Sequence, residues 1–197
     1  TITLNRVNNG AWTGNGHNGS IGITVNNCTA TVNTAITVTA ASGSHSNNKF
    51  YTNTIQNCNA GISFTGFAAS APYDLGDTNN DVGGTTSGTG NTIVNFGGGA
   101  GATQPATGVF ANSQWGFNCS RNTINNNNGS GVNHAQVLRG IFLNSSSASA
   151  SANCNFNTIT VKGGGTTHQV TAIENSFGST PAGNSINIRN NTITGEY

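Results

Sequence analysis

The chain has 197 residues, of which 34% are hydrophobic and 6% are charged, and its formal net charge is +1. It contains no Lys/Arg cluster and no interleaving of basic with aromatic residues, which argues against nucleic acid or an anionic membrane as a partner. No apolar run approaches the ~20 residues that a membrane-spanning helix needs, so no membrane span is predicted.

The local composition favours strands over helices. Met is absent and Glu and Lys are rare, whereas Asn, Thr, Gly and Ser occur in every segment. Such a chain has little helix propensity, and short runs of β-branched residues separated by turn residues are typical of strands. The first such run is TITL at residues 1–4. We therefore predict an all-β protein.

An Asn-Thr-Ile motif, or a close variant of it, returns along the chain. Aligned on its Thr, the copies lie at intervals of 30 to 38 residues, at Thr24, Thr54, Thr92, Thr123, Thr158 and Thr192. A second strand recurs between them, at residues 34–38, 60–64, 107–111, 139–143 and 171–175. A period of this length is typical of stacked repeat units, and each period has room for about three short strands.

We interpret each period as one coil of a parallel β-helix, with insertions confined to the corners between strands. The whole chain, residues 1–197, then forms a single domain of about six coils, each of roughly 30–38 residues with three short strands. The longest corner-loop insertion is predicted at residues 65–90. The expected fold class is an all-β, parallel β-solenoid.

The motif itself has a structural interpretation. Alternate side chains of a strand share one face, so the Asn and Ile of each copy point inward while the Thr points outward. The Ile side chains are expected to stack into the core, and the Asn side chains to hydrogen-bond to one another along the axis. The predicted ladder comprises Asn53, Asn91, Asn122, Asn157 and Asn191, next to Ile55, Ile93, Ile124, Ile159 and Ile193.

Three stretches resemble a known family: the repeated NTI, the segment GGTTSGTGNTIVNFGG and the ending GNSINIRNNTITG. From about Gly22 onward, the chain resembles the parallel β-helix repeats of large secreted bacterial surface proteins, many of which are exported by the type IX route and share a pectin-lyase-like fold. The resemblance implies a single-stranded, right-handed helix. It also implies a secreted, extracellular or cell-surface location and a structural or adhesive role.

Parallel β-helices also include pectate lyases and polygalacturonases, whose chemistry needs paired carboxylates or an acidic calcium site. The polygalacturonase pattern has Asp after Asn-Thr, where this chain has Ile or Val. The five acids do not recur in phase with the repeat; they are Asp74, Asp77, Asp81, Glu174 and Glu196. We therefore predict no catalytic residues and no enzymatic activity.

A calcium site is the one cofactor that the sequence suggests. Asp77, Asn79 and Asp81 are spaced as D-x-N-x-D-x-G, and hard oxygen ligands at alternate positions before a Gly turn suit Ca²⁺. Gly88 stands where an EF-hand loop would have its bidentate Glu. The alternative is a solvated turn rich in Asp, Asn and Gly, without a bound ion.

The cysteines fall into two pairs. Cys28 and Cys58 lie 30 residues apart in similar contexts, and Cys119 and Cys154 lie 35 residues apart. Strands of adjacent coils are ~4.8 Å apart, which is within the Cα separation that a disulfide accepts. The sequence therefore allows two coil-to-coil disulfides in an oxidising compartment, with buried free thiols as the equal alternative.

The two ends of the sequence suggest a function. Neither TITL at one end nor NNTITGEY at the other has the cap that the end of a solenoid requires. Like subunits, or further coils of the same polypeptide, are therefore the expected partners at both ends. We predict a non-enzymatic structural segment or subunit of a surface fibre, sheath or adhesin, assembled by end-to-end stacking.

Two other functions stay open. An ice-binding solenoid would use outward rows of Thr, which are interrupted at Gly90 and Arg121. A carbohydrate-binding or polysaccharide-degrading β-helix would bind surface glycans with its longer loops and four aromatic residues, namely Trp12, Trp115, Tyr51 and Tyr73.

Overall fold

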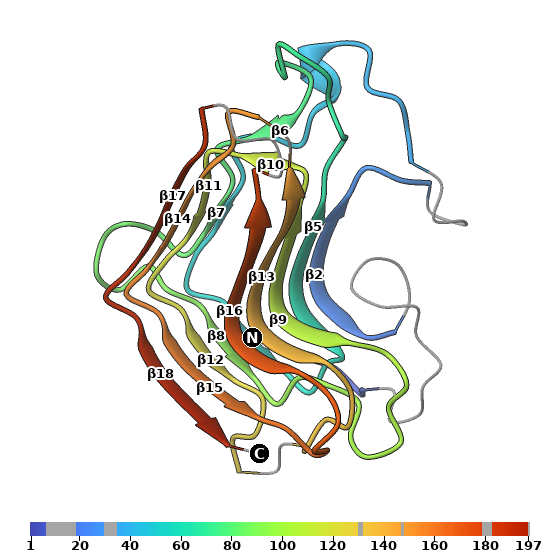
Figure 1. Ribbon diagram of the computed structural model, residues 1–197, viewed down its shortest axis with the longest axis vertical. Helices are drawn as coiled ribbons and strands as arrows, with labels where there is room; N and C mark the ends of the chain where they lie inside the picture. The colour runs from blue at the N-terminus through green and yellow to red at the C-terminus, as the bar shows by residue number, and fades with distance from the viewer. Residues whose placement is uncertain (7–18, 30–34, 130–131, 147, 179–182, 197) are drawn as a thin grey trace.

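The computed structural model describes residues 1–6, 19–29, 35–129, 132–146, 148–178 and 183–196. These residues form a parallel β-solenoid, in which strands from successive turns lie side by side around one core (Figure 1). The one helical element among them is the 3₁₀ turn η1 (Ala41–Gly43). The prediction of an all-β, parallel β-solenoid is confirmed.

Three parallel sheets surround the core. The first sheet holds the Asn-Thr-Ile strands: β1 (Ile2–Thr3), β4 (Thr54–Gln56), β8 (Thr92–Val94), β12 (Thr123–Asn125), β15 (Thr158–Lys162) and β18 (Thr192–Glu196). The second sheet holds β2 (Ile21–Asn26), β5 (Ala60–Thr65), β9 (Ala106–Asn112), β13 (Leu138–Ser146) and β16 (Val170–Phe177). The third sheet holds β3 (Lys49–Phe50), β7 (Asp81–Val82), β11 (Phe117–Cys119), β14 (Ser151–Asn155) and β17 (Ser185–Arg189). A separate pair, β6 (Asp77–Thr78) and β10 (Gln114–Trp115), lies at the corner between the second and third sheets.

Each turn passes from the second sheet to the third and then to the first. From β2 to β16 the chain completes about four turns, so the prediction of about six coils is wrong. The error lies at the start of the chain, because Thr24 belongs to β2 of the second sheet, where it pairs with Ser63. The first-sheet strand of this region is β1, in which Ile2 pairs with Ile55. A Thr between two β-branched residues suits either sheet, so the pattern alone does not distinguish them.

Two predicted segments differ in detail from the structure. Over the described part of residues 34–38, Ala35 makes only an isolated antiparallel bridge with Cys28, and Ile36 is 47% exposed. The place predicted for this strand in the second sheet is taken by β2. The insertion predicted at residues 65–90 contains the short strands β6 and β7 between its loops.

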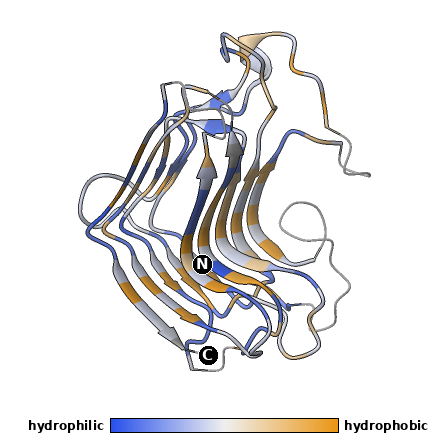
Figure 2. Cartoon of the chain, viewed as in Figure 1, coloured by the Kyte–Doolittle hydropathy of each residue, from blue (hydrophilic) through white to orange (hydrophobic). Residues whose placement is uncertain are grey.

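The first and second sheets pack closely because glycine faces isoleucine. A Cβ added to Gly108 would lie 2.7 Å from Cγ2 of Ile124, and one added to Gly140 would lie 2.6 Å from Cγ2 of Ile159. Carbon atoms do not approach so closely, so only glycine lets the two sheets meet here. In Figure 2 the hydrophobic positions recur at matching places on successive strands. The isoleucines of this stack are fully buried, namely Ile55, Ile93, Ile124 and Ile159.

Aromatic rings fill the wider space between the second and third sheets. Phe64 of β5 packs edge-on against Phe50 of β3 and Phe117 of β11, with ring centroids 5.5 Å apart in both pairs. Phe117 also contacts Phe177 of β16 at 6.5 Å. Edge-to-face packing of this kind adds to the stability gained from burial alone. The core is therefore narrow on the glycine side and wide on the aromatic side.

Candidate functional site

The motif asparagines form a continuous hydrogen-bonded ladder next to the first sheet. At each step, the backbone N–H and the side-chain Nδ2 of one Asn both donate to Oδ1 of the Asn in the next turn, over 2.9 to 3.1 Å. One amide oxygen thereby fixes both the backbone and the side chain of the preceding turn. The members, in chain order, are Asn53, Asn91, Asn122, Asn157 and Asn191.

The inner amides of this ladder are paired although they are buried. Asn122 and Asn157 are each 1% exposed. Nδ2 of Asn122 also donates to the carbonyl of Val82, and Nδ2 of Asn157 to the carbonyl of Cys119, each at 2.9 Å. An unpaired buried polar group would cost about 1–3 kcal/mol, so this pairing is what makes polar residues tolerable in the core.

The ladder has a direction, because donors in each turn face an acceptor in the next. At its first member, no donor among the described residues reaches Oδ1 of Asn53. At its last member, Nδ2 of Asn191 donates to the carbonyl of Cys154 at 2.9 Å, but its backbone N–H has no acceptor within the described part of the chain. One end of the ladder therefore presents an acceptor and the other a donor.

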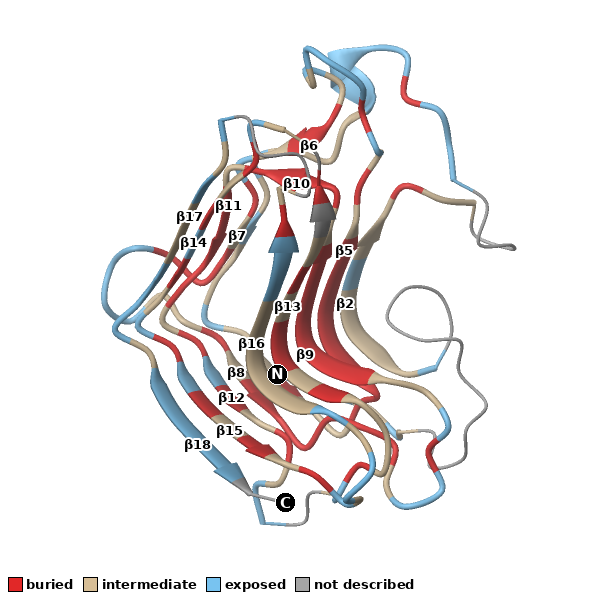
Figure 3. Cartoon of the chain, viewed as in Figure 1, coloured by how far each residue is buried: buried red, intermediate tan, exposed pale blue. Residues whose placement is uncertain are grey.

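The last turn exposes the edges of all three sheets, and we call this surface the last-turn edge. It consists of β16, β17 and β18, which are the terminal strands of the second, third and first sheets. Ile193 of β18 is 53% exposed, although its partner Ile159 in β15 is fully buried. Ile188 of β17 is 44% exposed, opposite the fully buried Cys154. Figure 3 shows the change from buried inner strands to the exposed β18.

The opposite ends of the three sheets form the first-turn edge, which consists of β1, β2 and β3. Ile2, Ile23, Val25 and Phe50 of these strands are only partly buried against the core. A terminal strand leaves a row of backbone N–H and C=O groups without a strand partner. Within the described parts of the chain, both edges therefore combine open strand edges with incompletely buried apolar side chains.

Asp77, the first of the predicted calcium ligands, has protein partners. Its side chain in β6 is 1% exposed, and its carboxylate accepts the backbone N–H of His45 at 2.9 Å and Nε2 of Gln114 at 3.2 Å. Burial raises the pKa of Asp77. Among the described residues, no group of three or more His, Cys, Asp or Glu side chains is placed to hold a metal ion.

Asp81, the second predicted acidic ligand, lies in β7 with other partners. Its carboxylate lies 2.8 Å from Nζ of Lys49 and accepts the hydroxyl of Tyr51 at 2.6 Å. This hydrogen bond raises the pKa of Tyr51 to about 12. Asn79, the third predicted ligand, is exposed. The carboxylates of Asp77 and Asp81 therefore both contact residues of neighbouring turns.

A second, shorter amide ladder runs at the corner before the third sheet and was not predicted. The backbone N–H and Nδ2 of Asn48 both donate to Oδ1 of Asn80, at 2.9 and 3.0 Å. Nδ2 of Asn80 donates in turn to Oε1 of Gln114 at 2.8 Å. The sequence did contain a signal for it, because NNKF at residues 47–50 and NNDV at residues 79–82 repeat an Asn pair directly before a strand.

All four cysteines are free thiols in the structure. Cys119 and Cys154 are fully buried in β11 and β14, which are neighbouring strands in register. Burial raises the pKa of Cys119, and it raises the pKa of Cys58 to about 12. Cys28 and Cys58 do not occupy matching places, because Cys28 follows β2 of the second sheet and Cys58 follows β4 of the first.

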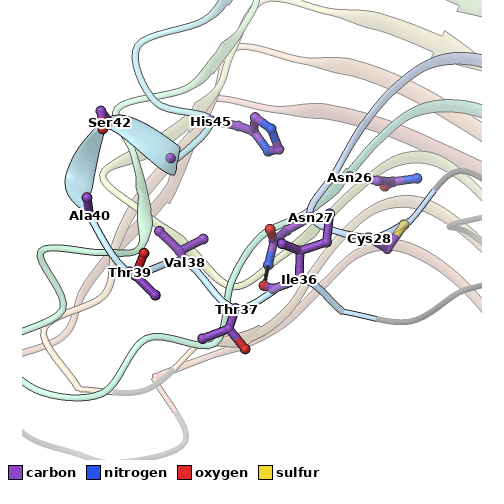
Figure 4. Close-up of a pocket in the computed structure, with 11 residues that line it drawn as sticks. Asn26, Asn27, Cys28, Ile36, Thr37, Val38, Thr39, Ala40, Ser42 and His45 are labelled. Carbon is purple, nitrogen blue, oxygen red and sulfur yellow. Dashed lines mark hydrogen bonds between the residues drawn. The ribbon is translucent and has the colours of Figure 1, made fainter.

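A pocket of about 520 Å³ opens beside the end of β2, and Figure 4 shows its lining residues. Its walls come from the end of β2 and from the segment that carries η1. Nδ2 of Asn27 donates to the carbonyl of Ile36 at 2.6 Å, which ties the two walls together. The thiol of Cys28 and the imidazole of His45 lie on different sides of the pocket. They therefore do not form the close nucleophile–base pair that covalent catalysis requires.

Three of the four aromatic residues considered for glycan binding lie within the described residues, and each has a protein partner. Tyr73 stacks on Trp115 with ring centroids 5.7 Å apart, and Trp115 is only 6% exposed. Tyr51 contacts Asp81 of β7 instead. Trp12 lies outside the described residues.

Of the remaining acids, Glu174 is held by a neighbouring strand. Its carboxylate accepts two hydrogen bonds from Arg139, at 2.5 and 3.3 Å. The guanidinium of Arg139 also lies 4.2 Å from the ring centroid of Phe142. Asp74 is exposed in the loop before β6. The Arg139–Glu174 pair links two turns of the second sheet.

The outward face of the first sheet carries an unbroken row of threonines. The interruptions expected at Gly90 and Arg121 concern the preceding Thr position of the Thr-x-Thr pattern, two residues before Thr92 and Thr123, so they remain beside this row. Strand register places one threonine of the row in each turn, at Thr54, Thr92, Thr123, Thr158 and Thr192.

No family model, curated protein or solved structure matches the chain. No helix within the described residues is long and apolar enough to cross a membrane. What the structure shows is a parallel β-solenoid of about four turns.

Proposed function

We propose that the protein is a non-enzymatic structural β-solenoid, a segment or subunit of an extracellular surface fibre, sheath or adhesin that assembles by end-to-end stacking. The observation that carries this proposal is the last-turn edge, where the described terminal strands of all three sheets are open on the same side. The resemblance to secreted bacterial β-helix repeats supports the surface location and the right-handed coil.

Stacking on the last-turn edge would pair the open backbone groups and bury the exposed apolar side chains at the same time. Strand addition pairs the open backbone N–H and C=O groups. It would also bury Ile193 as Ile159 is buried in the inner turns, and full burial of an Ile side chain is worth ~1.5–3 kcal/mol. A head-to-tail contact of this kind does not close on itself, so it produces filaments.

The test follows assembly of the purified chain across protein concentration by negative-stain electron microscopy and sedimentation velocity. We expect filaments that lengthen as the concentration rises. Ile193→Lys places a charge in the interface and should abolish them, with the fold checked by circular dichroism. The matched control Thr158→Lys alters an exposed, outward residue of an inner strand and should leave assembly intact. A wild type that is monomeric throughout, or equal assembly by the two variants, would contradict the proposal.

Ice binding is a second candidate function, favoured by the in-register row of threonines on the first sheet. Such a row repeats a hydroxyl group at the strand spacing of ~4.8 Å, and regularly spaced hydroxyl groups can anchor ordered water. Thermal hysteresis of the wild type tests this function. Thr158→Lys should abolish hysteresis and Ile193→Lys should preserve it, the reverse of the result expected for assembly. A wild type without hysteresis would reject ice binding.

A further inference from the structure

In each turn the chain passes from the third sheet to the first through a corner, and the last residue of this corner precedes a ladder asparagine (Figure 1). At one corner this residue is Gly90. At the other four it has a positive φ, of 55° in Thr52, 63° in Arg121, 58° in Phe156 and 54° in Asn190. Glycine and asparagine suit this left-handed region, whereas bulky side chains rarely adopt it. Arg121 and Phe156 are therefore unusual residues for this position.

Phe156 gains little from its place in the fold. A left-handed backbone is costly for a residue other than glycine, and such strain concentrates at functional sites. Burial does not offset this cost, because Phe156 is 48% exposed. Its ring contacts the guanidinium of Arg121, whose central carbon lies 4.6 Å from the ring centroid. Neither backbone preference nor burial therefore accounts for a phenylalanine at this corner.

Arg121 is held in place while part of its guanidinium stays open. Its Nε donates to the carbonyl of Thr85 at 2.9 Å, and the ring of Phe156 lies against its plane. Among the described residues, neither Nη1 nor Nη2 has a hydrogen-bond acceptor or a carboxylate in ion-pair range. These two nitrogens form a rigid fork that matches a carboxylate or a similar oxyanion. Arg121 is therefore preorganised for an acidic group from outside the chain.

The surroundings of this corner carry a second positive charge. Arg189 of β17 is exposed and pairs with Asn155, whose Oδ1 accepts its backbone N–H at 2.9 Å. The carbonyl of Asn155 accepts the backbone N–H of Arg121, also at 2.9 Å. The two arginines thus lie in turns on either side of Asn155, ~10 Å apart along the axis at the strand spacing.

No acidic residue opposes these charges in the strands that meet at the corner. The sequence has no Asp or Glu at residues 82–173 or 175–195, which include all of β11, β12, β14, β15 and β17. The neighbouring side chains are neutral amides and hydroxyls, such as Asn155, Asn190 and the exposed Thr158. Such groups both donate and accept hydrogen bonds, as sugar hydroxyls do. The corner therefore combines fixed positive charge, an exposed ring and neutral polar groups.

We propose that this corner binds an acidic polysaccharide through Arg121, Phe156 and Arg189. The fork of Arg121 pairs with a carboxylate or sulfate group of the polysaccharide, and Arg189 attracts a second one. The ring of Phe156 contacts the C–H face of a sugar. Two arginines are few for a nucleic acid, whose closely spaced phosphates are bound by many basic residues. The corner lies on the side of the solenoid, so the site does not rest on end-to-end stacking.

Affinity electrophoresis tests the site on the purified chain, in native gels that contain polygalacturonate, dextran sulfate or neutral dextran. We expect at least one acidic polymer to retard the protein and neutral dextran not to do so. Retardation by polygalacturonate identifies a carboxylate as the bound group, and retardation by dextran sulfate identifies a sulfate. Retardation by neither acidic polymer, or equal retardation by neutral dextran, would overturn the proposal.

The variant Phe156→Asn separates this site from general attraction between charges, because it leaves the net charge unchanged. Loss of the ring should weaken binding about tenfold. The midpoint of thermal unfolding should be unchanged or higher, because asparagine tolerates a positive φ. Binding as strong as that of the wild type would overturn the site, and a lower midpoint beside it would assign Phe156 a role in folding alone.

A pair of charge variants tests Arg121. Arg121→Gln should weaken binding about tenfold, because it removes the open fork. The matched control Lys162→Gln removes the same charge at the end of β15 that lies away from the corner, and it should change binding less than about twofold. Equal losses in the two variants would show that only net charge matters, which would overturn the site.

Discussion

The backbone N–H and Nδ2 of Asn122 both donate to Oδ1 of Asn157, at 2.9 and 3.1 Å. Oδ1 of Asn122 accepts the same two bonds from Asn91 in the preceding turn. Asn122→Ala therefore leaves the backbone N–H of Asn91 without its acceptor in the core. It also removes one of the acceptors of Nδ2 of Asn91 and the amide donor to the carbonyl of Val82. We expect this variant to lose roughly 3 kcal/mol of unfolding free energy, measured by urea denaturation.

The control for this prediction is Asn153→Ala. Asn153 is an exposed residue of β14, and among the described residues its amide contacts that of Asn187 in the next turn, at 3.1 Å. Its removal should cost less than about 0.5 kcal/mol. Similar losses in the two variants would show that the buried ladder stabilises the solenoid no more than a surface amide pair does.

The glycines that face the isoleucine stack should not tolerate a methyl group. In Gly108→Ala the new Cβ would meet Cγ2 of Ile124 and the carbonyl oxygen of Gly140, each at 2.7 Å. Overpacking of this kind costs about 1–3 kcal/mol, which we expect as a lower midpoint in thermal and urea unfolding. Gly195→Ala is the matched control, because its Cβ would lie 3.8 Å from its nearest neighbour among the described residues, the carbonyl oxygen of Val161. Equal effects of the two changes would argue against close contact between the first and second sheets.

Stability should fall in mild acid because of His134. This residue is 1% exposed, its Nδ1 accepts the N–H of Gly98 at 3.1 Å, and burial lowers its pKa from 6.5 to about 4. The unfolded chain therefore binds a proton between these two values that the folded chain does not. The contribution of neutral His134 to the free energy of unfolding is fully present above pH 6.5 and is lost as the pH falls towards 4. At ~1.4 kcal/mol per pKa unit, the loss is roughly 3 kcal/mol.

Urea denaturation at several pH values measures this dependence. His134→Asn keeps an acceptor near Gly98 but cannot be protonated, so it should flatten the profile between pH 6.5 and 4. His168→Asn, at a half-buried loop position, is the comparison and should change the slope much less, because the charge of His168 lowers the pKa of His134 by less than burial does. The raised pKa of Asp77 acts in the opposite sense, because its stabilising contribution belongs to the protonated form and is lost as the pH rises. An unchanged slope in His134→Asn would rule out this histidine as the source.

The thiols offer a direct count of free cysteines. Cys58, Cys119 and Cys154 are fully buried, and burial raises the pKa of Cys58 to about 12, so thiol reagents should not reach them in the folded protein. Only the half-buried Cys28 should react near pH 8, whereas four thiols should react in denaturant. Fewer than four reactive thiols in denaturant would show that a disulfide had formed, for which the neighbours Cys119 and Cys154 are the best placed.

The fold class could be predicted from the sequence because strand stacking is periodic. The inward Ile and Asn of each motif copy recur in the same phase, and in-register strands turn a shared phase into a shared position in space. The number of turns could not be predicted in the same way. Thr24 lies between Ile23 and Val25, a pattern that fits the first and second sheets equally well, and only its pairing with Ser63 identifies the second.

The corners were harder to predict because their contacts join distant residues. The spacing of Asp77, Asn79 and Asp81 is local, whereas the partners of the two carboxylates come from the preceding turn and from the next. A local pattern carries no information about the backbone N–H of His45, which lies 32 residues away. The exposure of Ile193 was hard to predict for a similar reason. It depends on whether another strand packs beside β18, and the sequence around Ile193 does not show this.

The inner ladder is built from carboxamides, which carry no net charge and do not titrate. Dissolved salt has little to screen along this column, and acid or alkali has nothing there to ionise. The alignment of successive turns is therefore insulated from the composition of the surrounding medium. A solenoid held in this way keeps its turns aligned when the salt concentration and the pH around it change.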